Sequence, residues 1–221
     1  AHLLAADPVT SAACPGGGLV LAAGVAVDLG GFTLSGSGVG VGVAIPTGGS
    51  VNNGTVRSFA TGVDVRGGAT LLAGITIRDN VGGGVRVDTP AAGARTVLES
   101  IMVEMNGGDG LHVVAAPGAV DIDDPAARPA PEDYGVVLRA DILGNLNGFT
   151  RNLGVGIHLG DPAQAADVTA RVADCTVRGN STGLLLEQRV GLVPGSDCGI
   201  PSSTCAGAMQ EMGCTGVTVL A

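Results

Sequence analysis

Four side chains that can carry charge or transfer protons recur at one position of a repeating pattern. Asp64, Arg86, His112 and His158 each stand two residues after a glycine, inside a short run of aliphatic residues. If these runs stack as neighbouring strands, Asp64 lies beside Arg86, and both lie near His112. A carboxylate, a guanidinium and an imidazole in contact can bind an anion or transfer a proton near neutral pH. Asp64, Arg86 and His112 are therefore the first catalytic candidates.

The same pattern has a simpler interpretation. Alternate residues of a strand point to opposite faces, so one position in two must face solvent and carry polar side chains. The column would then be an ordinary exposed strand face. His158 joins His112 only if the 46 positions that separate them add no extra turn of the chain.

A second column is expected from the strands that precede these glycines. Its members are Arg57, Arg78, Glu104, Leu143 and Arg178. Glu104 supplies a carboxylate, which makes it a further catalytic candidate. Arg78 and Glu104 on neighbouring strands are better explained as a surface ion pair, which contributes under about 1 kcal/mol.

Carboxylates also gather in a Pro/Asp-rich insertion at 115–133, where Asp121, Asp123 and Asp124 stand almost side by side. Hard carboxylate oxygens are the ligands that calcium prefers. The spacing lacks the positional glycine and terminal glutamate of a calcium loop. The alternative is a solvated, proline-rich loop without metal.

The elements that must position these residues form a repeat. Glycines at the start of the second strand of each unit, 20, 22, 26, 46 and 27 residues apart, are Gly42, Gly62, Gly84, Gly110, Gly156 and Gly183. Short strands of period two in units of this length predict a parallel β-helix, in which each strand pairs with its equivalent one turn along the axis. The long interval is an insertion.

Glycine and asparagine mark the expected corners. Glycine suits a positive φ or a close approach of two backbones. Asn80, Asn106, Asn145 and Asn180 recur at one corner, where amides can form a ladder and tolerate the left-handed conformation. Their expected role is structural.

The composition agrees with this fold. The chain has 39 glycines, one tyrosine and no tryptophan, so its core must be built from stacked aliphatic side chains. A net charge of −9 argues against nucleic acid or an anionic membrane as a partner. Apolar stretches are interrupted well before the roughly 18 residues of a membrane span.

The segments 27–38 (VDLGGFTLSGSG) and 51–59 (VNNGTVRSF) resemble the opening turns of right-handed parallel β-helix repeat proteins of the pectate-lyase-like superfamily. The resemblance extends over roughly 19–186 and implies a single all-β solenoid of about six or seven rungs. Lyases, glycoside hydrolases, epimerases and adhesins share this fold, which does not select among them. Lyases of this kind often use an arginine base beside calcium-binding carboxylates; here the first-strand column offers Glu104 alone.

Five cysteines and a chain that opens with Ala1 favour a secreted or cell-surface protein after removal of a signal peptide. Cys198 with Cys205, and Cys175 with Cys214, are one of fifteen two-bridge arrangements. This pairing leaves Cys14 as a buried thiol or an intermolecular bridge.

We therefore expect an N-terminal segment at 1–18, a β-helix at 19–189 and a Cys-rich segment at 190–221 that ends in a strand. Two functions follow. The first is an extracellular structural protein that self-associates head to tail into a fibre or surface layer through uncapped ends. The alternative is a polysaccharide lyase or hydrolase that uses the outer face, which the scarcity of aromatic residues and the absence of lysine disfavour.

Overall fold

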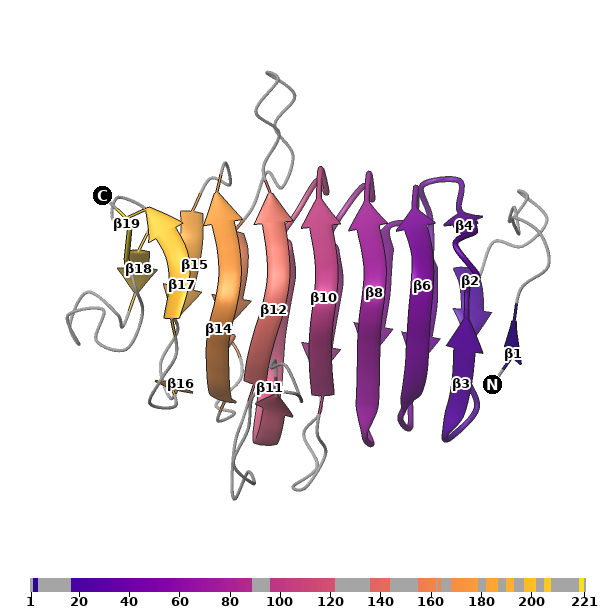
Figure 1. The fold of residues 1–221 in the computed structure, drawn as a ribbon, viewed down its shortest axis with the longest axis horizontal. Coiled ribbons are helices and arrows are strands. Elements are labelled where there is room, and N and C mark those ends of the chain that lie inside the picture. The colour runs from indigo at the N-terminus through magenta and orange to yellow at the C-terminus, as the bar shows by residue number, and fades with distance from the viewer. Residues whose placement is uncertain are drawn as a thin grey trace.

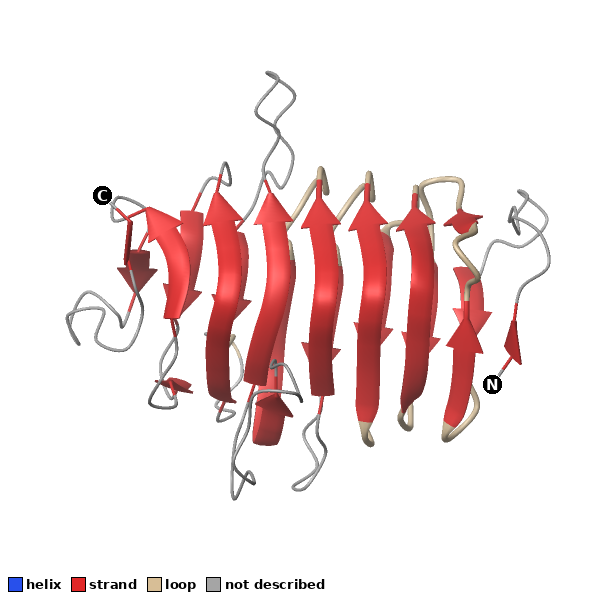
Figure 2. Cartoon of the chain, in the orientation of Figure 1, coloured by secondary structure: helices blue, strands red, loops and turns tan. Residues whose placement is uncertain are grey.

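The chain forms a parallel β-solenoid in the computed structural model (Figures 1 and 2). The backbone is described for 2–3, 17–88, 96–121, 136–143, 155–161, 163, 168–178, 182–186, 190–192, 197–201, 205–207 and 219–220, and side chains for 17–88, 96–114, 155–161, 163 and 185. These residues contain strands and turns but no helix. None of them therefore forms a helix that could span a membrane.

The strands alternate between two faces of the solenoid. Sheet A contains β1 (His2–Leu3), β3 (Val25–Asp28), β4 (Thr33–Ser35), β6 (Gly49–Arg57), β8 (Thr70–Arg78), β10 (Thr96–Glu104), β12 (Val136–Leu143), β14 (Val168–Arg178), β16 (Val190–Leu192) and β17 (Asp197–Pro201). Sheet B contains β2 (Gly17–Val20), β5 (Val41–Ile45), β7 (Thr61–Val65), β9 (Val85–Asp88), β13 (Val155–Leu159), β15 (Thr182–Leu186) and β18 (Cys205–Gly207).

Two further strands complete the set. β11 (Leu111–Asp121) begins in sheet B and continues into sheet A, and β19 (Val219–Leu220) pairs with β17. All these pairings are parallel, and equivalent strands follow one another along the long axis (Figure 1). The all-β parallel solenoid expected from the repeat is confirmed.

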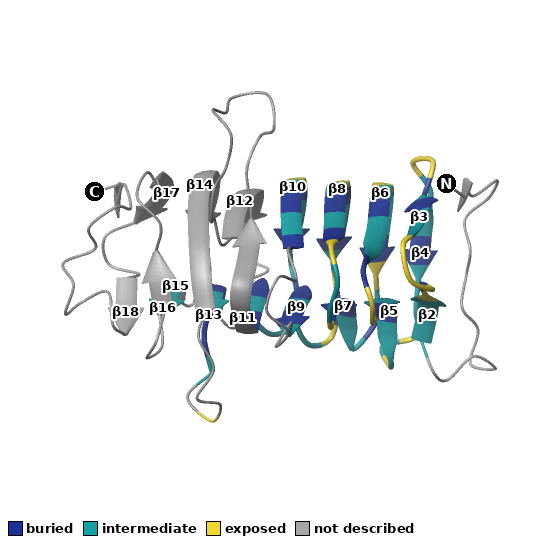
Figure 3. Ribbon diagram, turned by 90° about the horizontal axis from the view of Figure 1, so that it is seen from below, coloured by how far each residue is buried: buried dark blue, intermediate teal, exposed yellow. Residues whose placement is uncertain are grey.

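Apolar side chains stack inside the solenoid in continuous columns. In sheet B one column contains Val43, Val63, Val85, Leu111 and Ile157, each at most 1% exposed. Sheet A places Val51, Leu72 and Leu98 in a similar column, and all three are fully buried. The buried rows along both faces are visible in Figure 3. Because each residue packs on its equivalent one turn away, aliphatic side chains fill the core without large aromatics.

Close approach of two backbones and positive φ, the two features expected at the corners, occur at different residues. A Cβ added to Gly62 would lie 2.7 Å from the Gly84 carbonyl oxygen, and one added to Gly84 would lie 2.6 Å from that of Gly110. These glycines are therefore required by close approach of neighbouring turns. Positive φ falls elsewhere, for example at Asn53 (53°) and Gly74 (58°), where the long strands of sheet A bend.

Asparagines form the expected ladder at the corner that follows sheet A. The Asn80 side chain donates from Nδ2 to Oδ1 of Asn106 (2.8 Å), and Asn106 Oδ1 also accepts from the Asn80 backbone N–H (3.1 Å). In the preceding turn Phe59 N–H donates to Asn80 Oδ1 (3.0 Å). The expected left-handed conformation is wrong for these two asparagines, since it falls one residue earlier, at Asp79 and Met105. Asn145 and Asn180 lie outside the described residues.

The length of the solenoid differs slightly from the expectation of six or seven rungs. The part whose side chains are described over most of its length forms about four turns. Parallel pairing nevertheless extends past residue 189, since β17 pairs with β14 and β18 pairs with β15. The first residues of the expected insertion, 115–121, belong to β11. His112 pairs directly with His158, so the insertion adds no extra turn to sheet B.

Candidate functional site

The outer column of sheet B has the order that the sequence predicts. Asp64 pairs in register with Arg86, Arg86 with His112, and His112 with His158. The column continues from Ala44 at one side to Leu185 at the other. Successive strands lie about 4.8 Å apart, so neighbouring side chains of the column are close enough to interact. The predicted stacking of this column is confirmed, whereas its catalytic role stays a prediction.

Asp64 contacts two arginines and neither of the two histidines in the salt bridges of the described residues. Its carboxylate contacts Arg66 Nε through Oδ2 (2.7 Å) and lies 3.6 Å from Arg86 Nη1 through Oδ1. Arg86 also contacts Asp88 through Nη2 (2.8 Å). Asp64 lies two strands from His112, with Arg86 between them. Asp64 therefore follows the expected order of the column, and its buried carboxylate, 7% exposed, contacts the two arginines.

Asp109, His112 and His158 form a cluster of polar side chains at this column. The imidazole rings of the two histidines stack with centroids 4.3 Å apart and planes inclined by 2°. Asp109 Oδ2 lies 3.0 Å from Nδ1 of His158 and 3.9 Å from Nδ1 of His112. All three side chains are partly buried, with exposures between 14% and 27%. The cluster can accept or transfer a proton, and it is a candidate metal centre.

Asp109 is held by the turn on which it lies and by the next one. It precedes Gly110 at the corner before β11, and its Oδ1 accepts a hydrogen bond from the backbone N–H of Val155 (2.8 Å). Burial acts to raise the pKa of Asp109. The hydrogen bonds from His158 and Val155, with the two imidazoles, outweigh burial and hold the pKa below its usual value. The group is therefore a carboxylate at neutral pH.

His112 is fixed in one neutral form. Burial lowers the pKa of His112, and the neighbouring His158 lowers it further, against the opposing effects of Gly160, Asp109 and Asp161. Its Nε2 lies 3.2 Å from the carbonyl oxygen of Gly160. A carbonyl oxygen only accepts, so Nε2 carries the hydrogen and Nδ1 of the neutral ring presents a lone pair on the side of Asp109.

The sequence interpretation missed Asp109, although a signal was present. The residues before the corner glycines are Val41, Thr61, Gly83, Asp109, Val155 and Thr182. Asp109 is the acidic member of this set, and it stands three residues before His112. A carboxylate at a corner can reach side chains on its own strand and on the next one. Asp109 lies outside the strands, so a prediction based on strand positions does not include it.

The outer column of sheet A is also confirmed, and its contacts are those of a surface ion pair. Arg57, Arg78 and Glu104 stack in register, followed by Leu143 and Arg178. Arg78 contacts Glu104 (3.2 Å) and its neighbour Asp79 (2.8 Å). Glu104 therefore lies on sheet A, and the four catalytic candidates do not form one group.

Several other candidates lie wholly or partly outside the described residues. Asp123 and Asp124 lie outside the described residues, and Asp121 is described by its backbone alone. Cys14 and Cys214 also lie outside them. The backbone register pairs Cys175 with Cys198 and Leu184 with Cys205.

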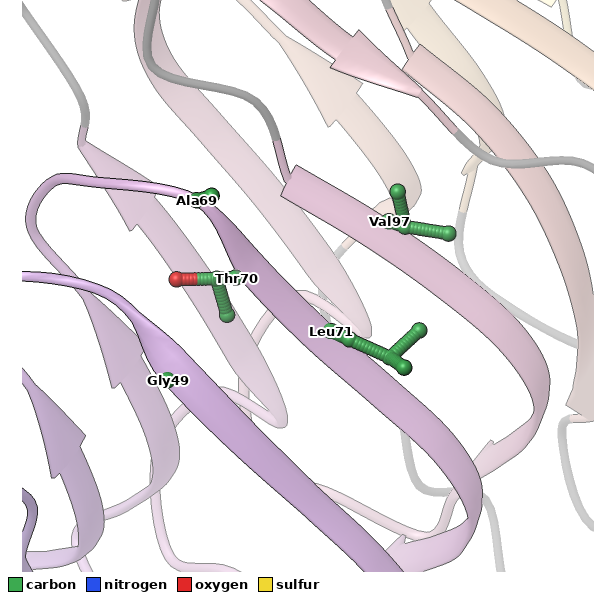
Figure 4. A pocket seen from close by; sticks show the side chains of 5 residues that line it. All are labelled: Gly49, Ala69, Thr70, Leu71 and Val97. Atoms are coloured by element: carbon green, nitrogen blue, oxygen red, sulfur yellow. The ribbon is translucent and has the colours of Figure 1, made fainter. Parts of the chain in front are cut away.

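A separate pocket of about 250 Å³ opens over β6, β8 and β10 of sheet A (Figure 4). Its lining consists of Gly49, Ala69, Thr70, Leu71 and Val97. The Thr70 hydroxyl is buried and has no hydrogen-bond partner among the described residues. These five residues carry no charge, and Thr70 supplies the one side-chain polar group among them.

Comparisons of the chain with protein-family models, with curated proteins and with solved structures find no match. The class that the fold defines is a parallel β-solenoid, and the resemblance to the pectate-lyase-like superfamily stays a proposal.

Proposed function

We propose that the chain is an extracellular structural protein of the parallel β-helix type, related to the pectate-lyase-like superfamily, that self-associates end to end. The observation that supports this proposal best is the position of β2 at the edge of sheet B among the described strands. Among the described strands, β2 pairs with β5 alone. An unpaired parallel strand presents backbone donors and acceptors to a second chain.

The hydrogen-bond pattern tells which groups of β2 are available. Leu21 N–H donates to the carbonyl of Ala44, on the side of β5. Alternate residues of a parallel strand direct their N–H and C=O groups to opposite sides, so those of Val20 point away from β5. The Val20 side chain is 76% exposed. A strand of a second copy that pairs with β2 would extend sheet B by one strand at the usual spacing of about 4.8 Å.

The proposal is tested by placing a charge on this edge. Val20→Lys should abolish end-to-end association, because lysine on an edge strand blocks strand addition. Val39→Lys is the matched control, since Val39 is also exposed (52%) but lies outside the strands, between β4 and β5. Analytical ultracentrifugation and electron microscopy should show elongated oligomers for the unmodified chain and the control. A wild-type chain that stays monomeric at high concentration would refute the proposal.

A second function has its own supporting observation. The 3.0 Å contact between Asp109 and His158, stacked on His112, is an arrangement that orients an imidazole for general acid–base catalysis. This favours a polysaccharide lyase or hydrolase on the outer face of sheet B. The test is depolymerisation of uronic-acid polymers by the purified chain. Activity that disappears in His112→Ala would support the enzyme; absence of activity from the wild-type chain would exclude these substrates.

A further inference from the structure

We infer that Asp109, His112 and His158 form a binding site for a divalent transition-metal ion of the zinc class. The inference goes beyond the end-to-end association proposed above, and it uses the same three side chains as the second candidate function. It rests on the approach of the three side chains, on the groups that hold them, and on the type of their ligand atoms.

The spacing of the ligand atoms is close to that of a metal centre. One ligand atom from each side chain can be chosen so that all three lie within 4.8 Å of one another. Two of these contacts, from Asp109 Oδ2 to the two Nδ1 atoms, are 3.0 and 3.9 Å. Ligands about 2.0–2.2 Å from a tetrahedral zinc ion lie roughly 3.4 Å apart. Small side-chain rotations therefore suffice to bring all three to one ion.

Two of the three side chains, His112 and Asp109, each use one polar atom to hydrogen-bond a backbone group, which leaves the other atom for a metal ion. His112 Nε2 donates to the Gly160 carbonyl, which leaves its Nδ1 lone pair for a cation. Asp109 Oδ1 accepts from Val155 N–H, which orients Oδ2 toward the histidines. Backbone partners of this kind fix the tautomer and direction of metal ligands.

The cluster also has an electrostatic reason to bind a cation. The Nδ1 lone pair of His112 and the negatively charged Oδ2 of Asp109 approach to 3.9 Å. Two acceptors that face each other are stabilised by a positive ion between them. Asp161 is close enough for its charge to act on His112. The nearby Arg86 is already paired with Asp88 and Asp64, which offsets its repulsion of a metal ion.

The ligand types select the class of metal. Two imidazoles and one carboxylate suit zinc, cobalt, nickel or copper, whereas calcium and magnesium prefer oxygen ligands. The stacked rings keep their in-plane lone pairs parallel, so binding requires at least one ring to tilt. Rotation about the last torsion of histidine is soft. On binding, the hydrogen on His158 Nδ1 moves to Nε2 through solvent, so the ring stays neutral.

The first test needs no substitution. The chain has three histidines, so their ring signals can be followed individually by nuclear magnetic resonance while zinc chloride is added to metal-free protein. Two of the three ring systems should shift and saturate at one equivalent of zinc, and the close ring stack should be lost. Shifts confined to His2, or no shift of any ring, would overturn the inference.

Substitutions then locate the site. His112→Ala and His158→Ala should each lower zinc affinity by more than about 100-fold, because loss of a ligand exceeds the 10- to 100-fold cost of losing an outer partner. His2→Ala, on β1, is the matched control and should leave affinity unchanged. Calorimetric titration measures all four proteins, and circular dichroism confirms that each is folded. Equal affinity in all four proteins would refute the site.

The cysteines require a separate control, since thiolates also bind zinc. Cobalt in place of zinc distinguishes the two ligand sets. Nitrogen and oxygen ligands should give visible bands without the intense sulfur-to-cobalt absorption of a thiolate site. A dominant thiolate spectrum that persists in His158→Ala would place the metal elsewhere.

Discussion

The asparagine ladder and the outer column of sheet B occupy two different positions of the repeat. One position keeps its residue type from turn to turn, and the other changes it. The ladder keeps the same side chain, and Asn80 and Asn106 are at most 2% exposed. The outer column changes its chemistry at every turn, from Asp64 through Arg86 to His112. A buried amide must find partners within the protein, so only a side chain that bonds to its own equivalent can recur there.

The outer column is less constrained, because Arg86, His112 and His158 are partly exposed to water, and the buried carboxylate of Asp64 is paired with Arg66 and Arg86. Each turn can therefore carry a different side chain without loss of the fold. This freedom explains why the cluster of Asp109, His112 and His158 occurs on the outside, where two turns and one corner meet. In this solenoid the inner positions maintain the repeat, and the outer positions are available for chemistry.

Breaking the ladder should have the largest effect. Asn106→Ala removes the acceptor of two hydrogen bonds from Asn80 and the donor to the Ile77 carbonyl (3.2 Å). We expect a loss of about 3–5 kcal/mol in the free energy of unfolding, because several buried polar groups lose their partner. Urea denaturation measures this loss. Asn52→Ala is the control and should cost under about 1 kcal/mol, since Asn52 Oδ1 has no hydrogen-bond partner among the described residues.

Substitution of a corner glycine should cause the next largest loss of stability. In Gly62→Ala the new methyl group would lie 2.4 Å from Ile77 Cγ2 and 2.7 Å from the Gly84 carbonyl oxygen. The neighbouring turn must shift, so we expect about 2–4 kcal/mol of destabilisation. In the control, Gly83→Ala, the nearest atom is the Asp109 carbonyl oxygen at 3.3 Å. Equal losses in both variants would show that the close approach at Gly62 is unimportant.

A substitution in the outer column of sheet B should lower the free energy of unfolding by less. Asp64→Asn keeps the shape of the side chain but removes the charge that faces Arg66 and Arg86. We expect a loss of about 1–2 kcal/mol, because the carboxylate is largely buried while Arg86 keeps its contact with Asp88. The loss should shrink as salt is added to the denaturation experiment, because Arg66 is exposed. A loss as large as that of Asn106→Ala would remove the distinction between the inner and outer positions.

The repeat predicted most of the fold because its constraints are local in sequence. Glycine spacing and period-two aliphatic runs identified the stacked core, the order of both outer columns and the corner at which Asn80 bonds to Asn106. The left-handed corner positions were not predictable by residue type. Ser58, Asp79 and Met105 share that conformation but no chemical property.

The candidate site was predictable only in part. His112 and His158 follow from strand register, whereas Asp109 depends on a corner side chain that reaches across to the next turn. The burial of Asp64 depends on how Arg66 and Arg86 fold over it. Such contacts are set by side-chain rotamers in three dimensions, so a strand pattern does not encode them.

The smallest effect is expected in the outer column of sheet A. Glu104→Gln removes one charge from the contact with Arg78, which keeps its other partner, Asp79. Arg78 is 36% exposed, so water replaces the lost interaction, and we expect a change below about 1 kcal/mol. Comparison with Asp64→Asn under the same conditions separates a pair whose carboxylate is 15% exposed from one whose carboxylate is 7% exposed. If both substitutions cost the same, burial of the carboxylate does not determine the strength of these contacts, and the two outer faces are energetically equivalent.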